Sequence, residues 1–143
     1  MGVCTARWCM VNTDTFALLP VSAFFAENSF DNYNTERSVD FKSWKIPAIS
    51  SGETVYSKKV MFSDYDHYFH VNNTKYADFM LDAFSVEELQ GKSLDSVQIT
   101  YVKQCKEGEE ITFLKEKNDG FYLVEGKVGD ELRVQMRVEF NDV

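Results

Sequence analysis

Both histidines of the chain lie in one polar segment, together with two aspartates and two asparagines. The segment spans residues 64–73 and reads Asp-Tyr-Asp-His-Tyr-Phe-His-Val-Asn-Asn. Carboxylates and imidazoles are the usual general acids and bases of enzymes, and carboxamides donate and accept hydrogen bonds. The composition is therefore typical of a site for proton transfer. A loop whose aspartates form turns and whose asparagines cap a helix has the same composition, and this alternative stays open.

A strand and a helix are expected on either side of this segment. Residues 54–62 alternate as a strand does, and a helix follows the asparagines. The apolar residues of this helix recur at spacings of three and four, namely Tyr76, Phe79, Met80, Ala83 and Phe84. Asn72 or Asn73 supplies the N-cap. The polar segment thus precedes a helix N-terminus, where free backbone N–H groups and the helix dipole favour negative charge.

The last third of the chain has the pattern of a sheet. Ser85 and Glu88 form a capping box for a short helical turn that stops at Gly91. Four strands separated by turns follow, at residues 94–104, 110–117, 121–128 and 132–140. The last strand alternates strictly, which predicts one apolar and one polar face. One strand, one long helix and a four-stranded antiparallel meander form an α+β fold in which the sheet wraps around the helix.

The first third of the chain has a different pattern. Residues 3–19 combine apolar and β-branched residues with turn formers at residues 12–14, which predicts two short strands or one hairpin. A short helix is expected after Pro20, at residues 21–27. Residues 28–54 are rich in Asn, Asp, Ser and Thr and are predicted to be a linker or a long ordered loop. We therefore expect a partial N-terminal segment at residues 1–54 and a main domain at residues 55–143.

Charge and cysteine usage exclude several classes of protein. The chain has 143 residues, with 23 acidic and 15 basic side chains and a net charge of −8. This balance argues against nucleic acid as a partner, and no segment approaches the ~20 apolar residues of a membrane span. Three cysteines without a CxxC pair fit reduced thiols in a cytoplasmic protein. Residues 1–10 do not have the pattern of a signal peptide.

The polar segment resembles the signature of the acyl-ACP thioesterases. In that family Asp-x-Asp-x-Asn-x-His-Val-Asn-Asn leads into the central helix of a hotdog fold. Residues 99–105, Ile-Thr-Tyr-Val-Lys-Gln-Cys, resemble the family's second motif, a strand that ends in an acidic residue followed by Cys. Arg7-Trp8 with Val11-Asn12 resembles the strand that closes the first of two tandem hotdog units. The resemblance implies that residues 55–143 form a hotdog domain and that residues 1–54 are a remnant of a first unit or a swapped segment.

The resemblance implies catalytic roles at five positions of this sequence. The catalytic Asp and His of the family correspond to Asp66 and His70, and its Cys corresponds to Cys105. Its catalytic Asn falls on Tyr68 and its acidic residue on Gln104, so the chain departs from the pattern at these two positions. A Gln has no titratable group, and a Tyr hydroxyl is bulkier and differently placed than a carboxamide. Either the mechanism has shifted or the activity has weakened.

The implied reaction is hydrolysis of a fatty acyl thioester, carried by acyl carrier protein or CoA, in fatty acid biosynthesis. Backbone N–H groups near Asn72 and Asn73 would polarise the thioester carbonyl. Tyr76 belongs to the helix face that forms the core and whose edge borders the acyl chain. Asp66 would activate the attacking group, and His70 would orient it or transfer the proton. Cys105 is either a covalent nucleophile or a packed thiol.

Hotdog active sites form between two hotdog units, so the resemblance implies a homodimer or pairing with a second hotdog unit. We expect no cofactor and no metal, because the loop that holds His67 and His70 also caps a helix and the spacing of the two is weak for a metal site. A catalytically degenerate hotdog that binds an acyl thioester or a partner subunit without turnover is the second hypothesis. A different hotdog reaction, such as dehydration, also stays open.

Overall fold

The structure is a computed structural model that describes residues 4–15, 17–27 and 45–143. The chain divides into two compact units, Met1–Trp44 and Lys45–Val143. The boundary between the two units lies after residue 44, whereas the expected boundary lies after residue 54. The difference arises because residues 45–52 pack within the second unit. The linker predicted at residues 28–54 falls outside the described residues up to Trp44.

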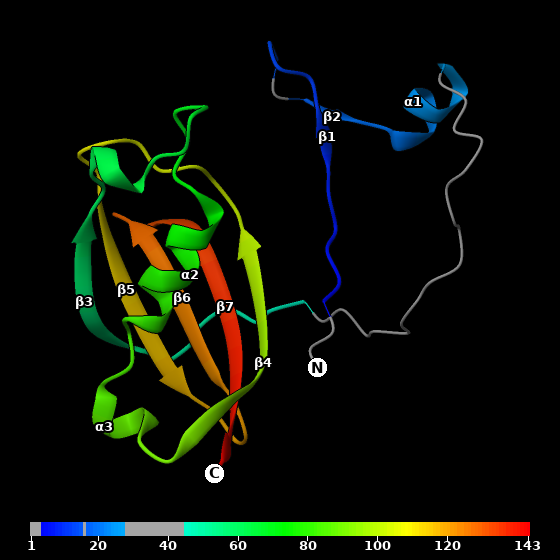
Figure 1. Cartoon of the computed structure of the whole chain (residues 1–143). Coiled ribbons are helices and arrows are strands. Elements are labelled where there is room, and N and C mark those ends of the chain that lie inside the picture. The colour runs from blue at the N-terminus through cyan, green and yellow to red at the C-terminus, as the bar shows by residue number, and fades with distance from the viewer. Residues whose placement is uncertain (1–3, 16, 28–44) are drawn as a thin grey trace. The chain divides into compact units, whose positions relative to one another are not determined.

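The first unit contains a small hairpin and a short helix. Strands β1 (Met10–Val11) and β2 (Leu18–Leu19) pair antiparallel, and helix α1 spans Val21–Glu27 (Figure 1). The side chain of Asn12 shapes the turn, because its Oδ1 accepts hydrogen bonds from the backbone N–H groups of Asp14 and Thr15. The predicted hairpin and helix are confirmed.

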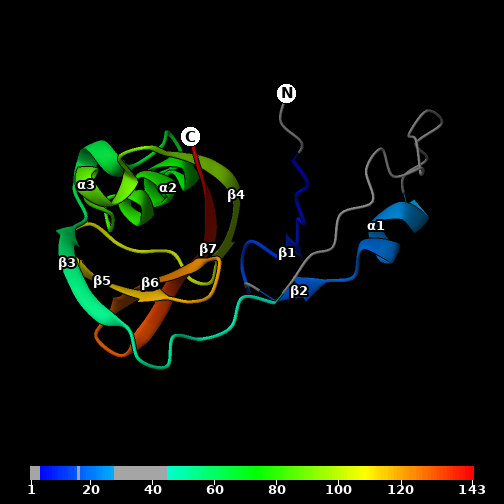
Figure 2. The same cartoon turned by 90° about the horizontal axis from the view of Figure 1, so that it is seen from below.

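The second unit holds one five-stranded antiparallel sheet and two helices. Its elements are β3 (Glu53–Lys59), the 3-10 turn η1 (Phe62–Asp64), α2 (Asn73–Leu81), α3 (Val86–Leu89), β4 (Lys92–Tyr101), β5 (Glu110–Lys117), β6 (Tyr122–Val128) and β7 (Glu131–Asp142). Figure 2 shows both helices on the same face of the sheet, which curves around α2. The predicted α+β class, with an antiparallel sheet around a central helix, is confirmed.

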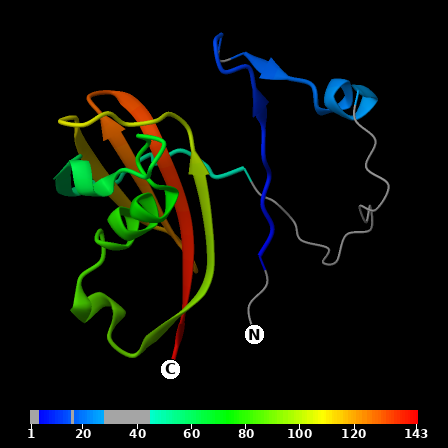
Figure 3. The same ribbon diagram turned by 45° about the horizontal axis from the view of Figure 1, so that its top comes forward.

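The order of the strands corrects one prediction. The sheet runs β3-β5-β6-β7-β4, so β5, β6 and β7 form a meander while β4 pairs with β7 at the far edge. The prediction of a four-stranded meander is therefore wrong for β4, which does not pair with β5. The segment after β4 crosses the end of the sheet to reach β5, which alternation alone does not reveal. Figures 1 and 3 show this segment, in yellow, at the same end of the domain as the green loop before α2.

The core lies between α2 and the curved sheet. Buried side chains of α2, namely Tyr76, Phe79 and Met80, pack against buried strand residues. Gly126 permits this packing, because a Cβ there would lie 2.8 Å from Val134 Cγ1 and 2.9 Å from Phe113 Cε1. The helix ends at Leu81, earlier than its apolar spacing predicts, yet Ala83 and Phe84 in the following turn remain buried in the core.

The opposite face of the sheet is less polar than predicted. Residues 45–52 cover part of it, with Ile46 buried and the backbone N–H of Ile49 donating to Glu125 at 3.0 Å. On this face Glu125 of β6 and Arg133 of β7 are buried, although strand alternation predicts an exposed polar face for β7. None of the described helices is long and apolar enough to span a membrane.

Candidate active site

The polar segment before α2 folds into a narrow hairpin. The backbone N–H of Asp66 donates to the carbonyl of His70 at 2.8 Å. At its base, the N–H of Asn72 donates to the carbonyl of Asp64 at 2.9 Å. These bonds bring Asp66 and His70 to opposite sides of one turn, so the two predicted catalytic residues lie side by side on the main chain.

The carboxylate of Asp66 organises the tip of this hairpin. Its Oδ1 accepts hydrogen bonds from the N–H groups of Tyr68 at 2.9 Å and His70 at 3.2 Å. Phe69 adopts a φ of 59°, a left-handed conformation that closes the turn. Among the residues that the structure describes, none donates to Oδ2 of Asp66. One oxygen of the carboxylate therefore holds the loop while the other can accept a proton.

The side chains of His70 and Tyr68 both point into solvent. His70 is exposed, and its imidazole contacts no carboxylate within the described part of the chain. Tyr68 is 71% exposed, and its ring lies against His67 with the centroids 3.8 Å apart. The structure thus joins Tyr68 to Asp66 through the main chain, and it shows no contact of the phenol with either catalytic candidate.

The N-terminus of α2 faces the same loop. Asn72 is the N-cap, and its Oδ1 accepts from the N–H and the hydroxyl of Thr74, both at 2.9 Å. The N–H of Asn72 is already bonded to Asp64, whereas that of Asn73 donates to no residue that the structure describes. Of the two predicted carbonyl-binding positions, Asn73 has the free donor.

Residues after β4 pack against this loop and bring Gln104 and Cys105 to it. The contacts run from Gln104 Nε2 to the Val71 carbonyl at 3.4 Å, from the Cys105 N–H to the Tyr76 hydroxyl at 2.9 Å, and from the Glu107 N–H to the Tyr65 hydroxyl at 2.6 Å. The second predicted motif therefore lies beside the first, as the resemblance implies.

Cys105 and Tyr76 are core residues in this arrangement. The Cys105 side chain is 1% exposed, and burial raises the pKa of its thiol. Burial likewise raises the pKa of the Tyr76 hydroxyl, which the Cys105 N–H already occupies. The structure gives neither group a surface from which to contact a substrate.

Two charged residues that position these loops were not predicted as site residues. Asp64 is 5% exposed, and its carboxylate accepts from the N–H of Met61 at 2.8 Å and from Lys58 Nζ at 2.9 Å. Arg133, expected on the polar face of β7, is buried and donates to the carbonyl of Gln104 at 2.7 Å. Asp64 belongs to the sequence motif and could have been found there, whereas nothing in the local sequence distinguishes Arg133.

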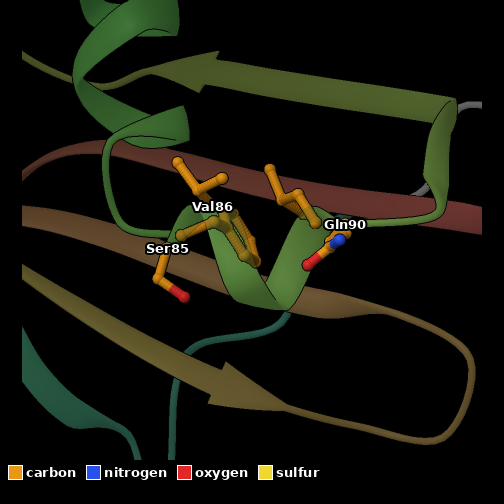
Figure 4. Close-up of a pocket in the computed structure, with 5 residues that line it drawn as sticks. Ser85, Val86 and Gln90 are labelled. Atoms are coloured by element: carbon orange, nitrogen blue, oxygen red, sulfur yellow. The ribbon is translucent and has the colours of Figure 1, made fainter.

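The described residues include no group of three or more His, Cys, Asp or Glu side chains that could hold a metal ion. An open hollow of about 500 Å³ lies at α3, lined by Phe84, Ser85, Val86, Leu89 and Gln90 (Figure 4). It follows the C-terminal end of α2, whereas the catalytic candidates precede the N-terminal end. No titratable side chain lines it, so it offers no proton donor or acceptor for catalysis.

Solved structures share this fold. An acyl-ACP thioesterase from Bacteroides thetaiotaomicron is 24% identical with a TM-score of 0.77, over 92% of this chain and 53% of that chain. The 12:0-ACP thioesterase from Umbellularia californica is 19% identical with a TM-score of 0.71, over 93% of this chain and 53% of that chain. The chain thus spans about half the length of these structures. At these identities the similarity establishes the hotdog fold.

No significant match is found among curated proteins. Residues 50–141, by contrast, match the family described as the acyl-ACP thioesterase C-terminal domain. This range contains the hairpin of Asp66 and His70, helix α2 and the segment with Gln104 and Cys105. Motif, fold and family profile agree over the same residues, and the chain belongs to the acyl-ACP thioesterase family.

Proposed function

We propose that this chain hydrolyses fatty acyl thioesters carried by acyl carrier protein or CoA, in fatty acid biosynthesis. The observation that carries the proposal is the carboxylate of Asp66, whose Oδ1 is held by its own loop while Oδ2 accepts from no described residue. This loop leads into helix α2, where the Asn73 N–H donates to no described residue. A base and an electrostatic donor on either side of a reacting carbonyl are what thioester hydrolysis requires.

In the proposed reaction the carbonyl oxygen of the thioester accepts a hydrogen bond from the Asn73 N–H. Asp66 takes a proton from a water molecule, which adds to the carbonyl carbon. The C–S bond then breaks, and the proton that Asp66 took from water passes through His70 to the departing thiolate, so that a fatty acid and a free thiol are released. A preorganised backbone donor of this kind contributes about 3 kcal/mol to stabilisation of the transition state.

The remaining predicted residues have supporting roles in this proposal. Gln104 orients the Val71 carbonyl at the start of α2 and could bind the water molecule. Tyr68 lies at the exposed rim of the site, and Tyr76 holds the backbone of Cys105 from the core. Burial of the Cys105 thiol supports packing over covalent catalysis.

The unpaired, exposed thiols of Cys4 and Cys9 support a cytoplasmic location.

We further propose that a second hotdog unit, from another copy or another chain, packs at the β4 edge. The two edges of the sheet differ in character. Strand β3 ends at the exposed Lys59, which discourages edge pairing, whereas β4 exposes Leu94, Val97 and Tyr101 and has its charged residues only at positions 92 and 95. Tyr101 also donates to the Asn73 carbonyl at 3.2 Å, so this edge borders the proposed site.

The proposal is tested by measuring free thiol released from acyl-ACP and acyl-CoA of several chain lengths. His70→Gln is expected to lower kcat/KM on the order of 10²-fold, because it removes the proton-transfer group. His67→Gln is the matched control, since it changes the same residue type in the same exposed loop, and it should leave activity within about twofold. Equal losses in the two variants would contradict the assignment of His70.

A binding protein without turnover is the second candidate function. The observation that favours it is the departure from the family pattern at two positions, where Tyr68 replaces an Asn and Gln104, which has no titratable group, replaces an acidic residue. Wild-type protein that binds an acyl thioester with defined stoichiometry, yet releases no thiol from any chain length, would establish this function in place of hydrolysis.

A further inference from the structure

Arg133 is a buried cation at the end of the sheet where the two site loops meet. Its side chain is on β7 and the residue is 6% exposed. Its Nη1 donates to the carbonyl of Gln104 at 2.7 Å, and its Nη2 donates to Glu109 at 3.0 Å and pairs with Glu131 at 3.2 Å. A guanidinium buried in this way has desolvation to overcome, so each of these contacts is needed to stabilise it.

The main chain of Arg133 binds the same segment. Its carbonyl accepts from the N–H groups of Val102 at 2.8 Å and Lys103 at 3.1 Å. The segment from Val102 to Glu109 is thus held at both ends and at Gln104 by one residue of β7. This segment is the one whose Gln104 and Cys105 contact the hairpin and helix of the proposed site.

We propose that Arg133 is a positioning residue of the catalytic site, which holds Gln104 and Cys105 against the loop of Asp66 and His70. This inference rests on the proposed function for its catalytic consequence. Its structural consequence, a closed segment 102–109, can be measured separately. Arg133 touches neither Asp66 nor His70 in the structure, so its effect passes through the backbone of Gln104.

A planar guanidinium suits the three contacts that Arg133 makes at this position. It reaches a carbonyl and two carboxylates at once with donors in fixed directions. A lysine has one ammonium group, and it can retain the charge while losing part of this geometry. Replacing Arg133 with Lys therefore separates charge from shape, and replacing it with Met removes both.

The first test measures the reactivity of Cys105 toward a thiol reagent in a Cys4→Ser, Cys9→Ser background, since both of these thiols are exposed. Arg133→Met should increase the rate of Cys105 labelling by about tenfold or more under native conditions, because opening of the segment exposes the thiol. Arg133→Lys should give an intermediate rate and serves as the test if the Met variant does not fold. Urea unfolding of each variant measures how much global unfolding contributes to the rate of Cys105 labelling.

The matched control is Arg137→Met on the same strand. Arg137 pairs with Glu139 and lies over the ring of Phe121, away from segment 102–109. If Arg133 only stabilised the sheet, the two Met variants would label Cys105 at equal rates once corrected for their urea midpoints. That result would overturn the proposal.

The second test is the steady-state rate of thiol release. Arg133→Met should lower kcat on the order of 10-fold with KM changed much less, because small displacements of catalytic groups are costly while substrate contacts remain. Arg133→Lys should recover part of kcat. Labelling that increases without loss of kcat would overturn the catalytic role. If the wild type releases no thiol, the proposed function fails, while the labelling comparison still decides whether Arg133 holds the segment.

Discussion

In the proposed reaction Asp66 combines two tasks, one structural and one catalytic. Its Oδ1 binds two backbone N–H groups and so shapes the turn, and its Oδ2 is left for chemistry. An alanine variant would lose both tasks together and could not show which one matters. The aspartate therefore calls for a substitution that preserves the acceptor and removes the charge.

Asp66→Asn is this substitution, because the amide oxygen can still accept from Tyr68 and His70. We expect its urea midpoint to remain close to wild type and its kcat to fall on the order of 10²- to 10⁴-fold, since an amide is not a base. Asp66→Ala should lose stability as well, by about 1–2 kcal/mol. An Asn variant that retains wild-type kcat would show that the carboxylate serves the loop alone.

Residues 45–52 form neither helix nor strand, and two carboxylates of the sheet hold them in place. The backbone N–H groups of Ser50 and Ser51 donate to Glu116 at 2.8 and 2.6 Å, and that of Ile49 donates to Glu125. Burial raises the pKa of Glu125. The hydrogen bonds from Lys127, Ile49 and Gln135 lower this pKa by more than burial raises it, so the pKa lies below its ordinary value of about 4.5.

The sign of this shift predicts acid sensitivity. A carboxyl whose pKa is lowered by folding stabilises the protein fully above its ordinary pKa, and this contribution is lost as pH falls through the folded pKa. Urea midpoints measured from pH 7 to pH 3 should therefore show a stability gap between wild type and Glu125→Gln that narrows below about pH 4.5. Glu110→Gln, at an exposed position, is the control. A gap that stays constant with pH would refute this role of Glu125.

At the scale of the whole molecule, the exposed β4 edge is the feature that the domain alone does not explain. Its apolar side chains lie on the face that also carries α2, where Tyr101 packs edge to face against Tyr76 at 5.9 Å. The stretch of this edge from Ser96 to Tyr101 carries no charged side chain to protect it, so it is open to pairing with another strand.

Val97→Lys tests this pairing, because Val97 is 48% exposed on β4 and a lysine there opposes burial of the edge. We expect wild-type protein to elute as a dimer in size-exclusion chromatography with light scattering, and the variant to shift toward monomer and lose activity. Thr54→Lys places the same charge on the opposite edge strand, β3, and should leave the mass unchanged. A wild-type monomer that is fully active would contradict the pairing.

The sequence by itself determined the local structure and the composition of the candidate site. Capping residues, turn formers and alternation are short-range signals, so Asn72 at the start of α2, the Ser85–Glu88 box and strand β5 at Glu110–Lys117 were predicted correctly. The motif resemblance likewise predicts Asp66 and His70 as catalytic residues, and this stays a prediction.

Tertiary structure alone decided which strands are neighbours and which polar groups are buried. The pairing of β4 with β7 depends on contacts between residues far apart in the chain, which no local pattern encodes. The same holds for Arg133. The alternation of β7 predicts that its side chain is exposed to solvent, but in the structure the segment after β4 covers it. Periodicity reports which face of a strand a side chain occupies, whereas burial depends on what the rest of the chain places over that face.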